Sequence, residues 1–323
     1  MMIDAYTHAM PSCYRDVLLK LGIQEHYFLP PYLADMESRR ELMTQFPGLK
    51  SVITPMQLPL SRDLPDSTFM DLARIYNDGM AEMASKYPDI ISAVVACVPF
   101  NNIDDAMKEA ERAVKELGMK GILLPCNCQG MEPSSPEVMP LIETMAEFDL
   151  PVWMHPWPIA SSRPFVPNSG GWEMLADTAD AMLHLACSGI FEKYPNAKFV
   201  AHHGGAYIPY FHTRLKSQYF WDMGAQGHMY DPEFVEPDHT VPYMYYENLK
   251  KFYVDTAFYH HCAPQIRACI DYFGADHVMF GTDFPLPSSR ELAPNIESIQ
   301  QMGLSKDDEE LVFHGNIERI LGL

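Results

Sequence analysis

The sequence is poor in cysteine and in basic residues. Its seven cysteines are odd in number and scattered over 323 residues, which favours reduced thiols over a disulfide framework. Only 23 residues are Lys or Arg, against 43 Asp or Glu, so the formal net charge is −20 at pH 7. Without a basic run, such a chain repels nucleic acids and anionic membranes. We therefore expect neither as a partner.

Long apolar runs are also missing. No window stays apolar for about 18 residues, the length that suggests a membrane span. The first residues, MMIDAYTHAM, lack the basic and apolar regions of a signal peptide, so we expect a cytoplasmic protein. Hydrophobic residues make up 47% and charged residues 20% of the chain, which is the composition of a globular protein with a large core.

The chain does have a repeated alternation of elements. Short apolar, β-branched segments predict strands, and helical stretches such as 70–86 and 103–117 lie between several of them. This alternation indicates parallel βαβ units, and eight of them close a (β/α)8 TIM barrel, which fits one domain over 1–323. The predicted strands are 2–5, 51–54, 91–98, 120–124, 151–154, 198–201, 252–255 and 277–280.

One segment, 222–248, does not fit the alternation. It is rich in Tyr, Pro, Met and acidic residues and is too long for a simple connection between a strand and a helix. We interpret it as an excursion over the barrel mouth or as a subunit contact.

Four polar residues follow the predicted strands at the end where barrel enzymes keep their catalytic groups. His8 follows the first strand, His155 the fifth, His202 the sixth and Asp283 the eighth. Each of them alone suits a structural role, but their shared position at one rim favours a reaction centre. We therefore expect the four side chains to meet at the carboxyl ends of the strands.

The local sequence around these residues suggests a role for each. His155 stands in WMHPW, an apolar setting that favours a neutral imidazole and hence a metal ligand. His202 directly ends its strand before His203 and two glycines, so we prefer it to His203 for the reaction centre. Asp283, in GTDFP, has a carboxylate that binds a divalent cation or moves a proton.

Several short motifs occur in an order that is specific as a set. They are the opening ID-x-x-x-H, the HPW after the fifth strand, GIFEKYP at 189–195, the H-x-G-G-A turn, GTDFP and the terminal GNIERILGL. With these motifs the chain resembles the amidohydrolase superfamily, in the branch that includes aminocarboxymuconate-semialdehyde decarboxylase. The resemblance runs from end to end.

The resemblance implies one divalent metal ion, Zn²⁺ or Mn²⁺, at the barrel mouth. Its ligands would be His8, His155 and Asp283, with His202 as general acid or base and Asp283 as a second candidate for moving the proton. The first His of the family's H-x-H pair falls on Tyr6, and a neutral phenol is a poor ligand. Three outcomes stay open: three protein ligands plus water, an ionised Tyr6 as ligand, or loss of the metal. With three ligands, affinity should be lower and Zn²⁺ less favoured than Mn²⁺.

Further residues suggest how a substrate is held. Arg214 lies near the place where relatives keep an arginine that contacts a substrate carboxylate, commonly across a dimer interface, so the resemblance implies a homodimer or larger homo-oligomer. Trp157 and Phe284 flank the ligands and suit an aromatic-accepting pocket. Tyr6 is a further candidate for substrate binding.

The leading hypothesis is a non-oxidative decarboxylase, a C–C lyase that acts on a small unsaturated or aromatic carboxylate. The same residues suit a metal-dependent hydrolase of an amide, ester or lactone, in which a water is activated instead. A barrel that binds a ligand without turnover is a third interpretation. A fold alone does not choose between these functions, because function resides in the site.

Overall fold

The strands form a parallel arrangement that follows the chain order. The computed structural model describes residues 1–23, 31–56, 58, 64–127, 130–157, 170–222, 247–259, 261–286 and 291–323. One sheet has the order β1-β2-β3 and another the order β4 to β9, with every neighbouring pair parallel. The strands are β1 Met2–Ala9, β2 Leu49–Pro55, β3 Ile91–Val94, β4 Ala96–Cys97, β5 Ile122–Pro125, β6 Val152–His155, β7 Phe199–Ala201, β8 Tyr253–Asp255 and β9 Val278–Met279.

Backbone hydrogen bonds join the two sheets into a closed barrel. The amide of Lys120 donates to the carbonyl of Val94 at 2.9 Å, which links the third predicted strand to its neighbour across the break between β3 and β4. The amide of Ala5 donates to the carbonyl of Phe280 at 2.8 Å, so the last strand lies beside the first. The prediction of a (β/α)8 barrel is confirmed, and the third predicted strand is divided in two.

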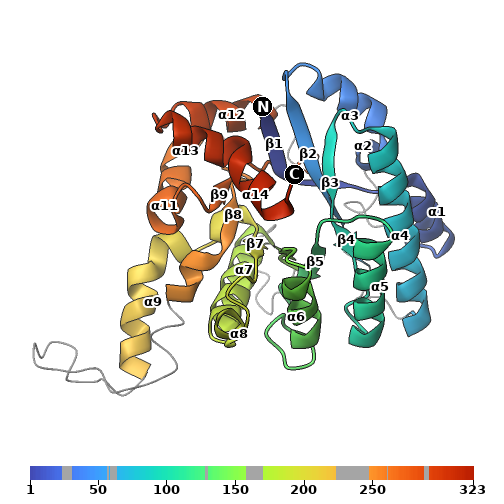
Figure 1. The fold of residues 1–323 in the computed structure, drawn as a ribbon, viewed down its shortest axis with the longest axis horizontal. Coiled ribbons are helices and arrows are strands. Elements are labelled where there is room, and N and C mark those ends of the chain that lie inside the picture. Colours follow the sequence, from blue (N-terminus) through green and yellow to red (C-terminus); the bar gives the residue numbers. More distant parts are fainter. Residues whose placement is uncertain are drawn as a thin grey trace, which may run out of the picture.

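Helices surround the strands (Figure 1). The predicted stretch 103–117 is α5, and its start is stabilised because the side chain of Asn102 accepts a hydrogen bond from the amide of Asp105 at 3.2 Å. The described helices are α1 Ser12–Lys20, α2 Pro31–Ala34, α3 Met36–Met43, α4 Asp66–Lys86, α5 Ile103–Lys115, α6 Met139–Glu147, α7 Gly170–Ala186, α8 Ile190–Lys193, α9 Ile208–Asp222, α11 Ala263–Phe273, α12 Leu292–Gln300, α13 Lys306–Glu310 and α14 Asn316–Leu321, with the short turns η1 His203–Gly205, η2 Leu249–Lys251 and η4 Leu311–Gly315.

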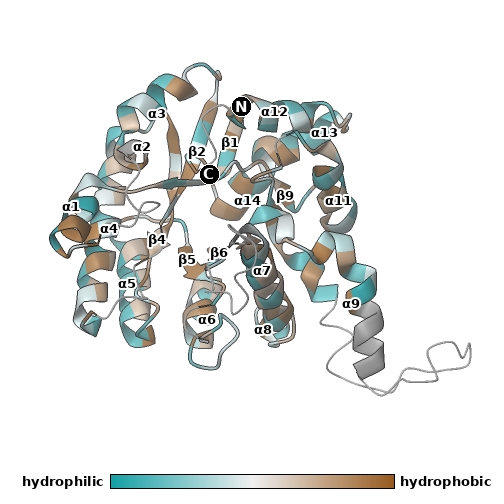
Figure 2. Ribbon diagram, turned by 180° about the vertical axis from the view of Figure 1, so that it is seen from behind, coloured by the Kyte–Doolittle hydropathy of each residue, from teal (hydrophilic) through white to brown (hydrophobic). Residues whose placement is uncertain are grey.

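Two apolar layers hold the barrel together. Inside it, side chains from several strands, such as Val52 of β2, Leu123 of β5 and Val200 of β7, pack with Ile317 and Ile320 of α14. A larger cluster fills the space between the strands and the surrounding helices. In Figure 2 strands such as β5 are hydrophobic, whereas the helices carry both hydrophilic and hydrophobic residues. The interior is therefore packed, and His8, His202 and Asp283 are buried where the strands end.

Most of the predicted excursion at 222–248 lies outside the described residues, since 223–246 fall between two described ranges. Within the described ranges, no helix is long and apolar enough to cross a membrane.

Candidate metal centre

Four side chains meet at the carboxyl ends of β1, β6, β7 and β9. One ligand atom from each of His8, His155, His202 and Asp283 lies within 4.8 Å of all the others. The Oδ1 atom of Asp283 is 2.9 Å from Nε2 of His8 and 3.3 Å from Nε2 of His202. His8, His202 and Asp283 are buried, and His155 is partly exposed. The structure thus brings together the four residues that the strand-end pattern singled out.

In His8 and His155, the outer ring nitrogen is Nδ1, which points away from the centre and lies beside a backbone carbonyl. Nδ1 of His8 lies 3.2 Å from the carbonyl oxygen of Pro55, and Nδ1 of His155 lies 2.7 Å from that of Pro156. A carbonyl only accepts, so each Nδ1 carries the proton and each Nε2 keeps its lone pair. Burial is the largest cause that lowers the pKa of His155 to about 3, and the neighbouring imidazoles of His8 and His202 lower it further. His155 is therefore a neutral imidazole, which is the form that binds metals.

His202 presents its outer nitrogen to a carboxylate. Its Nδ1 lies 2.7 Å from Oδ2 of Asp255, and both side chains are buried. Burial lowers the pKa of His202, but the charges of Asp255 and Asp283 together outweigh it and raise the pKa to about 9. Sequence reasoning missed Asp255, although it ends the seventh predicted strand just as the other candidates end theirs. That position was the available signal.

The inward atoms fit a cation. Among the described residues, Nε2 of His8, Nε2 of His202 and Oδ1 of Asp283 have no hydrogen-bond partner of acceptable geometry. Burial raises the pKa of Asp283, but the neighbouring His202 and His8 hold it well below its usual range, so the group is a carboxylate. A lone pair of His8 facing a buried carboxylate oxygen is unfavourable unless positive charge lies between them. Imidazole nitrogens with a carboxylate oxygen form a donor set that Zn²⁺ and Mn²⁺ accept.

Tyr6, which the resemblance predicts at the place of the first family ligand, presents no ionised oxygen to the centre. Its hydroxyl donates to the carbonyl of Met154 at 3.1 Å, and its ring stacks on His202 with centroids 3.8 Å apart. Burial, followed by the charges of Asp255 and Asp283, raises its pKa well above the usual value. Of the three alternatives at this position, the structure disfavours a phenolate ligand.

The loop after β7 has an unusual backbone. His203, Gly204, Gly205 and Ala206 have φ angles of 56°, 64°, 70° and 55°, and a left-handed conformation costs a residue other than glycine about 1–2 kcal/mol. At Gly204 a Cβ atom would lie 2.3 Å from Cε2 of Tyr259, so glycine is required there. Residues held in such conformations cluster at functional sites.

The remaining candidates are Trp157, Phe284 and Arg214. The amide of Trp157 donates to Oδ2 of Asp177 at 2.8 Å. The carbonyl of Phe284 accepts a hydrogen bond from the amide of His8 at 2.7 Å, and the buried guanidinium of Arg39 lies 5.0 Å from the centre of the Phe284 ring. Arg39 also donates to the carbonyl of His8 at 2.8 Å. Arg214 is an exposed residue of α9.

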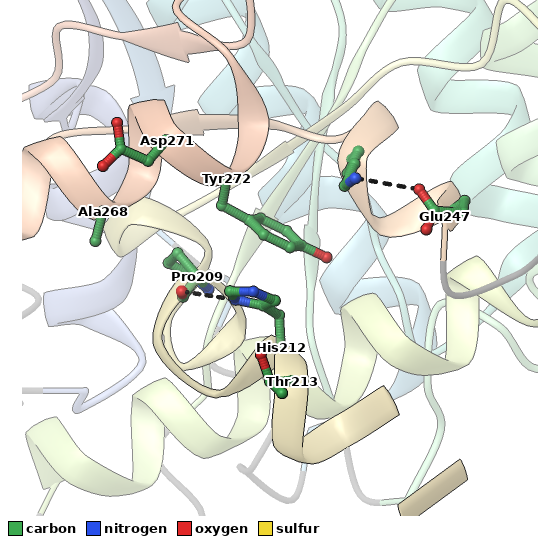
Figure 3. Close-up of a pocket in the computed structure, with 8 residues that line it drawn as sticks. Pro209, His212, Thr213, Glu247, Ala268, Asp271 and Tyr272 are labelled. Atoms are coloured by element: carbon green, nitrogen blue, oxygen red, sulfur yellow. Dashed lines mark hydrogen bonds and ion pairs between the residues drawn. The ribbon is translucent and has the colours of Figure 1, made fainter. Parts of the chain in front are cut away.

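A cavity of about 490 Å³ lies elsewhere, between α9, η2 and α11 (Figure 3). Several of its lining groups contact one another: Nζ of Lys250 lies 3.2 Å from Oε2 of Glu247, and His212 faces Tyr272 with ring centroids 4.9 Å apart. The residues that line it do not include any of the predicted site residues. We assign no function to this cavity.

Known proteins share both the sequence pattern and the fold. The sequence profile of the Amidohydrolase family matches residues 64–323. A gamma-resorcylate decarboxylase of Polaromonas sp. is 28% identical to this chain, over 90% of this chain and 89% of the relative. A 2-amino-3-carboxymuconate-6-semialdehyde decarboxylase of Dictyostelium discoideum is 27% identical, over 79% of this chain and 67% of the relative. The crystal structure of a dihydroxybenzoic acid decarboxylase from Polaromonas sp., with bound manganese and an inhibitor, superposes with a TM-score of 0.80 at 22% identity, covering 100% of this chain and 97% of that one.

Proposed function

Because this chain belongs to the amidohydrolase family, we propose that it is a metal-assisted, non-oxidative decarboxylase of a small aromatic or unsaturated carboxylate. The observation that carries the proposal is the convergence of His8, His155, His202 and Asp283 within 4.8 Å. The decarboxylases among its relatives support the reaction class, since the Polaromonas enzyme aligns over 90% of this chain.

His8, His155 and Asp283 are the proposed ligands of one divalent ion. With Nδ1 protonated, each of the two imidazoles has its lone pair on Nε2, and Asp283 supplies a negative oxygen close to both His8 and His202. The metal, when bound, supplies positive charge that polarises a substrate oxygen. We favour Mn²⁺ over Zn²⁺, because a structural neighbour holds manganese.

His202 is the proposed proton donor. With Nδ1 bound to Asp255, its second proton sits on Nε2, which faces the metal ligands and hence the bound substrate. In the metal-free protein the charges of Asp255 and Asp283 raise the pKa of His202 to about 9, so its surroundings favour the protonated form. Nε2 would give its proton to the substrate carbon that carries the carboxylate, the carbon–carbon bond would break, and CO₂ would leave. A proton from water then restores His202. Asp283, whose lowered pKa keeps it ionised, suits the role of ligand better than that of donor.

The substrate ring is proposed to lie against Tyr6, whose ring stacks on His202, and against Trp157 and Phe284, which follow His155 and Asp283 in the sequence. Arg214 is proposed to bind a substrate carboxylate in a homodimer or larger homo-oligomer, where the subunits meet. The cytoplasmic location stays a prediction.

A direct assay tests the proposed function. The protein loaded with Mn²⁺ is incubated with hydroxybenzoates such as 2,6-dihydroxybenzoate, named in a related decarboxylase complex, and with simple amides, esters and lactones. We expect release of CO₂ together with the corresponding phenol. Hydrolysis without CO₂ would favour the hydrolase interpretation, and a lack of metal binding would contradict the proposed centre.

A further inference from the structure

His203 is a buried histidine that the proposed reaction does not use. Only 8% of its surface is exposed, and its ring lies on His202 with centroids 3.7 Å apart. Within the described residues, its Nδ1 atom is buried and has no hydrogen-bond partner. Buried polar atoms in folded proteins nearly always have a partner, so an orphaned one calls for an explanation.

The ring is not needed to shape the loop. The carbonyl of His203 accepts from the hydroxyl of Tyr259 at 2.7 Å, and its amide donates to Oδ1 of Asp255 at 3.2 Å. These contacts involve only the backbone and would form with any residue. At a φ of 56° glycine fits best, as the next two residues, Gly204 and Gly205, illustrate. The chain thus keeps an imidazole at a position where both its backbone and its side chain are unfavourable.

Phe258 lies on the outer side of this imidazole. Its ring centroid is 5.5 Å from that of His203, it is 47% exposed, and its φ is also positive, at 61°. His203 therefore stands between His202, at the reaction centre, and an aromatic side chain at the surface.

We propose that His203 determines substrate specificity. Nδ1 makes a hydrogen bond with an oxygen substituent on the ring of the bound acid, separate from the oxygen that the metal polarises, and Phe258 covers the ring beside it. This inference rests on the proposed function. A polar atom that stays unpaired until the correct substrate arrives discriminates strongly, because an analogue without that oxygen leaves it unpaired.

Binding measurements on matched variants test this role. His203→Gly removes the imidazole and suits the backbone, and His203→Asn keeps a polar group while tolerating the same φ. Isothermal titration of the Mn²⁺-loaded protein compares 2-hydroxybenzoate with 2,3-, 2,4- and 2,6-dihydroxybenzoate. We expect the wild type to bind at least one dihydroxybenzoate about tenfold more tightly than 2-hydroxybenzoate, the effect of roughly one hydrogen bond. His203→Gly should erase this preference and His203→Asn should restore part of it.

The same variants distinguish a structural role. His203→Gly should keep its metal content and have an unfolding midpoint at least as high as that of the wild type. If it keeps the preference for the second hydroxyl, or weakens all four acids equally, the inference is wrong while the proposed function stands. If the wild type binds Mn²⁺ but none of the acids, the proposed substrate class is wrong and the inference falls with it.

Discussion

The candidate metal centre has two sides that use histidine in different chemical settings. One side lies at the ends of β1 and β6, and the other at the ends of β7 and β8. On the first side, His8 and His155 direct Nδ1 to the carbonyl oxygens of Pro55 and Pro156. On the second, His202 directs Nδ1 to the carboxylate of Asp255. All three direct Nε2 to the same small volume. The difference between them lies in the outer acceptor.

That outer acceptor separates two roles. A neutral carbonyl fixes the tautomer without adding charge, so the imidazole stays neutral and can bind a metal. A carboxylate stabilises the imidazolium, so the ring can hold and release a proton. The pKa of His155, lowered to about 3, and that of His202, raised to about 9, lie on opposite sides of neutrality. Identical side chains in one cluster therefore need not share a function.

Removing a proposed ligand should have the largest effect. In His155→Ala we expect the dissociation constant for Mn²⁺ to rise by at least about 100-fold and turnover to be lost with it, because too few donors remain. Titration with Mn²⁺ and elemental analysis measure the metal. His184→Ala, which removes an exposed histidine of α7 paired with Glu132, is the control and should bind metal normally. Normal metal binding by His155→Ala would contradict its role as ligand.

Removing the proposed proton donor should separate turnover from metal binding. His202→Ala is expected to lower kcat by roughly 10²–10⁴-fold, the usual contribution of general acid or base catalysis, while its metal content stays near that of the wild type. Metal and turnover are measured on the same preparations. A variant that loses both would make His202 a fourth ligand, as its place within 4.8 Å of the other donors allows. Near-normal turnover would move the proton transfer to Asp283 or Tyr6.

Replacing the carboxylate of Asp255 by a neutral amide should lower the pKa of His202 and so make this ring more like that of His155. In Asp255→Asn we expect the pKa of His202 to fall from about 9 and kcat to fall by about 10–100-fold, as for other outer-shell partners. NMR titration of the metal-free protein measures the pKa, and Asp89→Asn, at an exposed ion pair with Arg40, is the control.

The same variant should change how stability depends on pH. His202 has an ordinary pKa of 6.5, raised to about 9 in the folded chain. Its contribution to stability is therefore fully present below pH 6.5 and is lost as the pH rises towards 9, by up to about 3 kcal/mol. Denaturation of the metal-free protein at several pH values should show this decline in the wild type. The decline should be much smaller in Asp255→Asn, and an unchanged decline would mean that Asp255 is not its cause.

The sequence predicted the positions of the site residues better than the partners that define their chemistry. Strand-end positions fix where His8, His155 and Asp283 lie, because parallel strands in a closed barrel end at one rim. The outer acceptors were not predictable in this way: the carbonyl of Pro55 belongs to the next strand, and no side-chain pattern marks a carbonyl. Asp255 could have been found from its strand end. The left-handed backbone of His203 depends on contacts with Tyr259, 56 residues away.

Substitutions of Tyr6 should have the smallest effects, and they test whether the β1 and β6 side of the centre has a third metal ligand. Tyr6 lies on β1, the side of neutral ligands, yet its ring stacks on His202 and its hydroxyl is bound to Met154. Tyr6→His adds an imidazole where the resemblance predicts the first family ligand, so we expect affinity for Mn²⁺ to rise by about tenfold if the new nitrogen reaches the ion. Tyr6→Phe removes only the hydrogen bond to Met154, with a loss of about 1 kcal/mol in stability and unchanged metal affinity. Weaker Mn²⁺ binding by Tyr6→Phe would show that the phenol is a ligand after all, and that the first side of the centre includes a third donor.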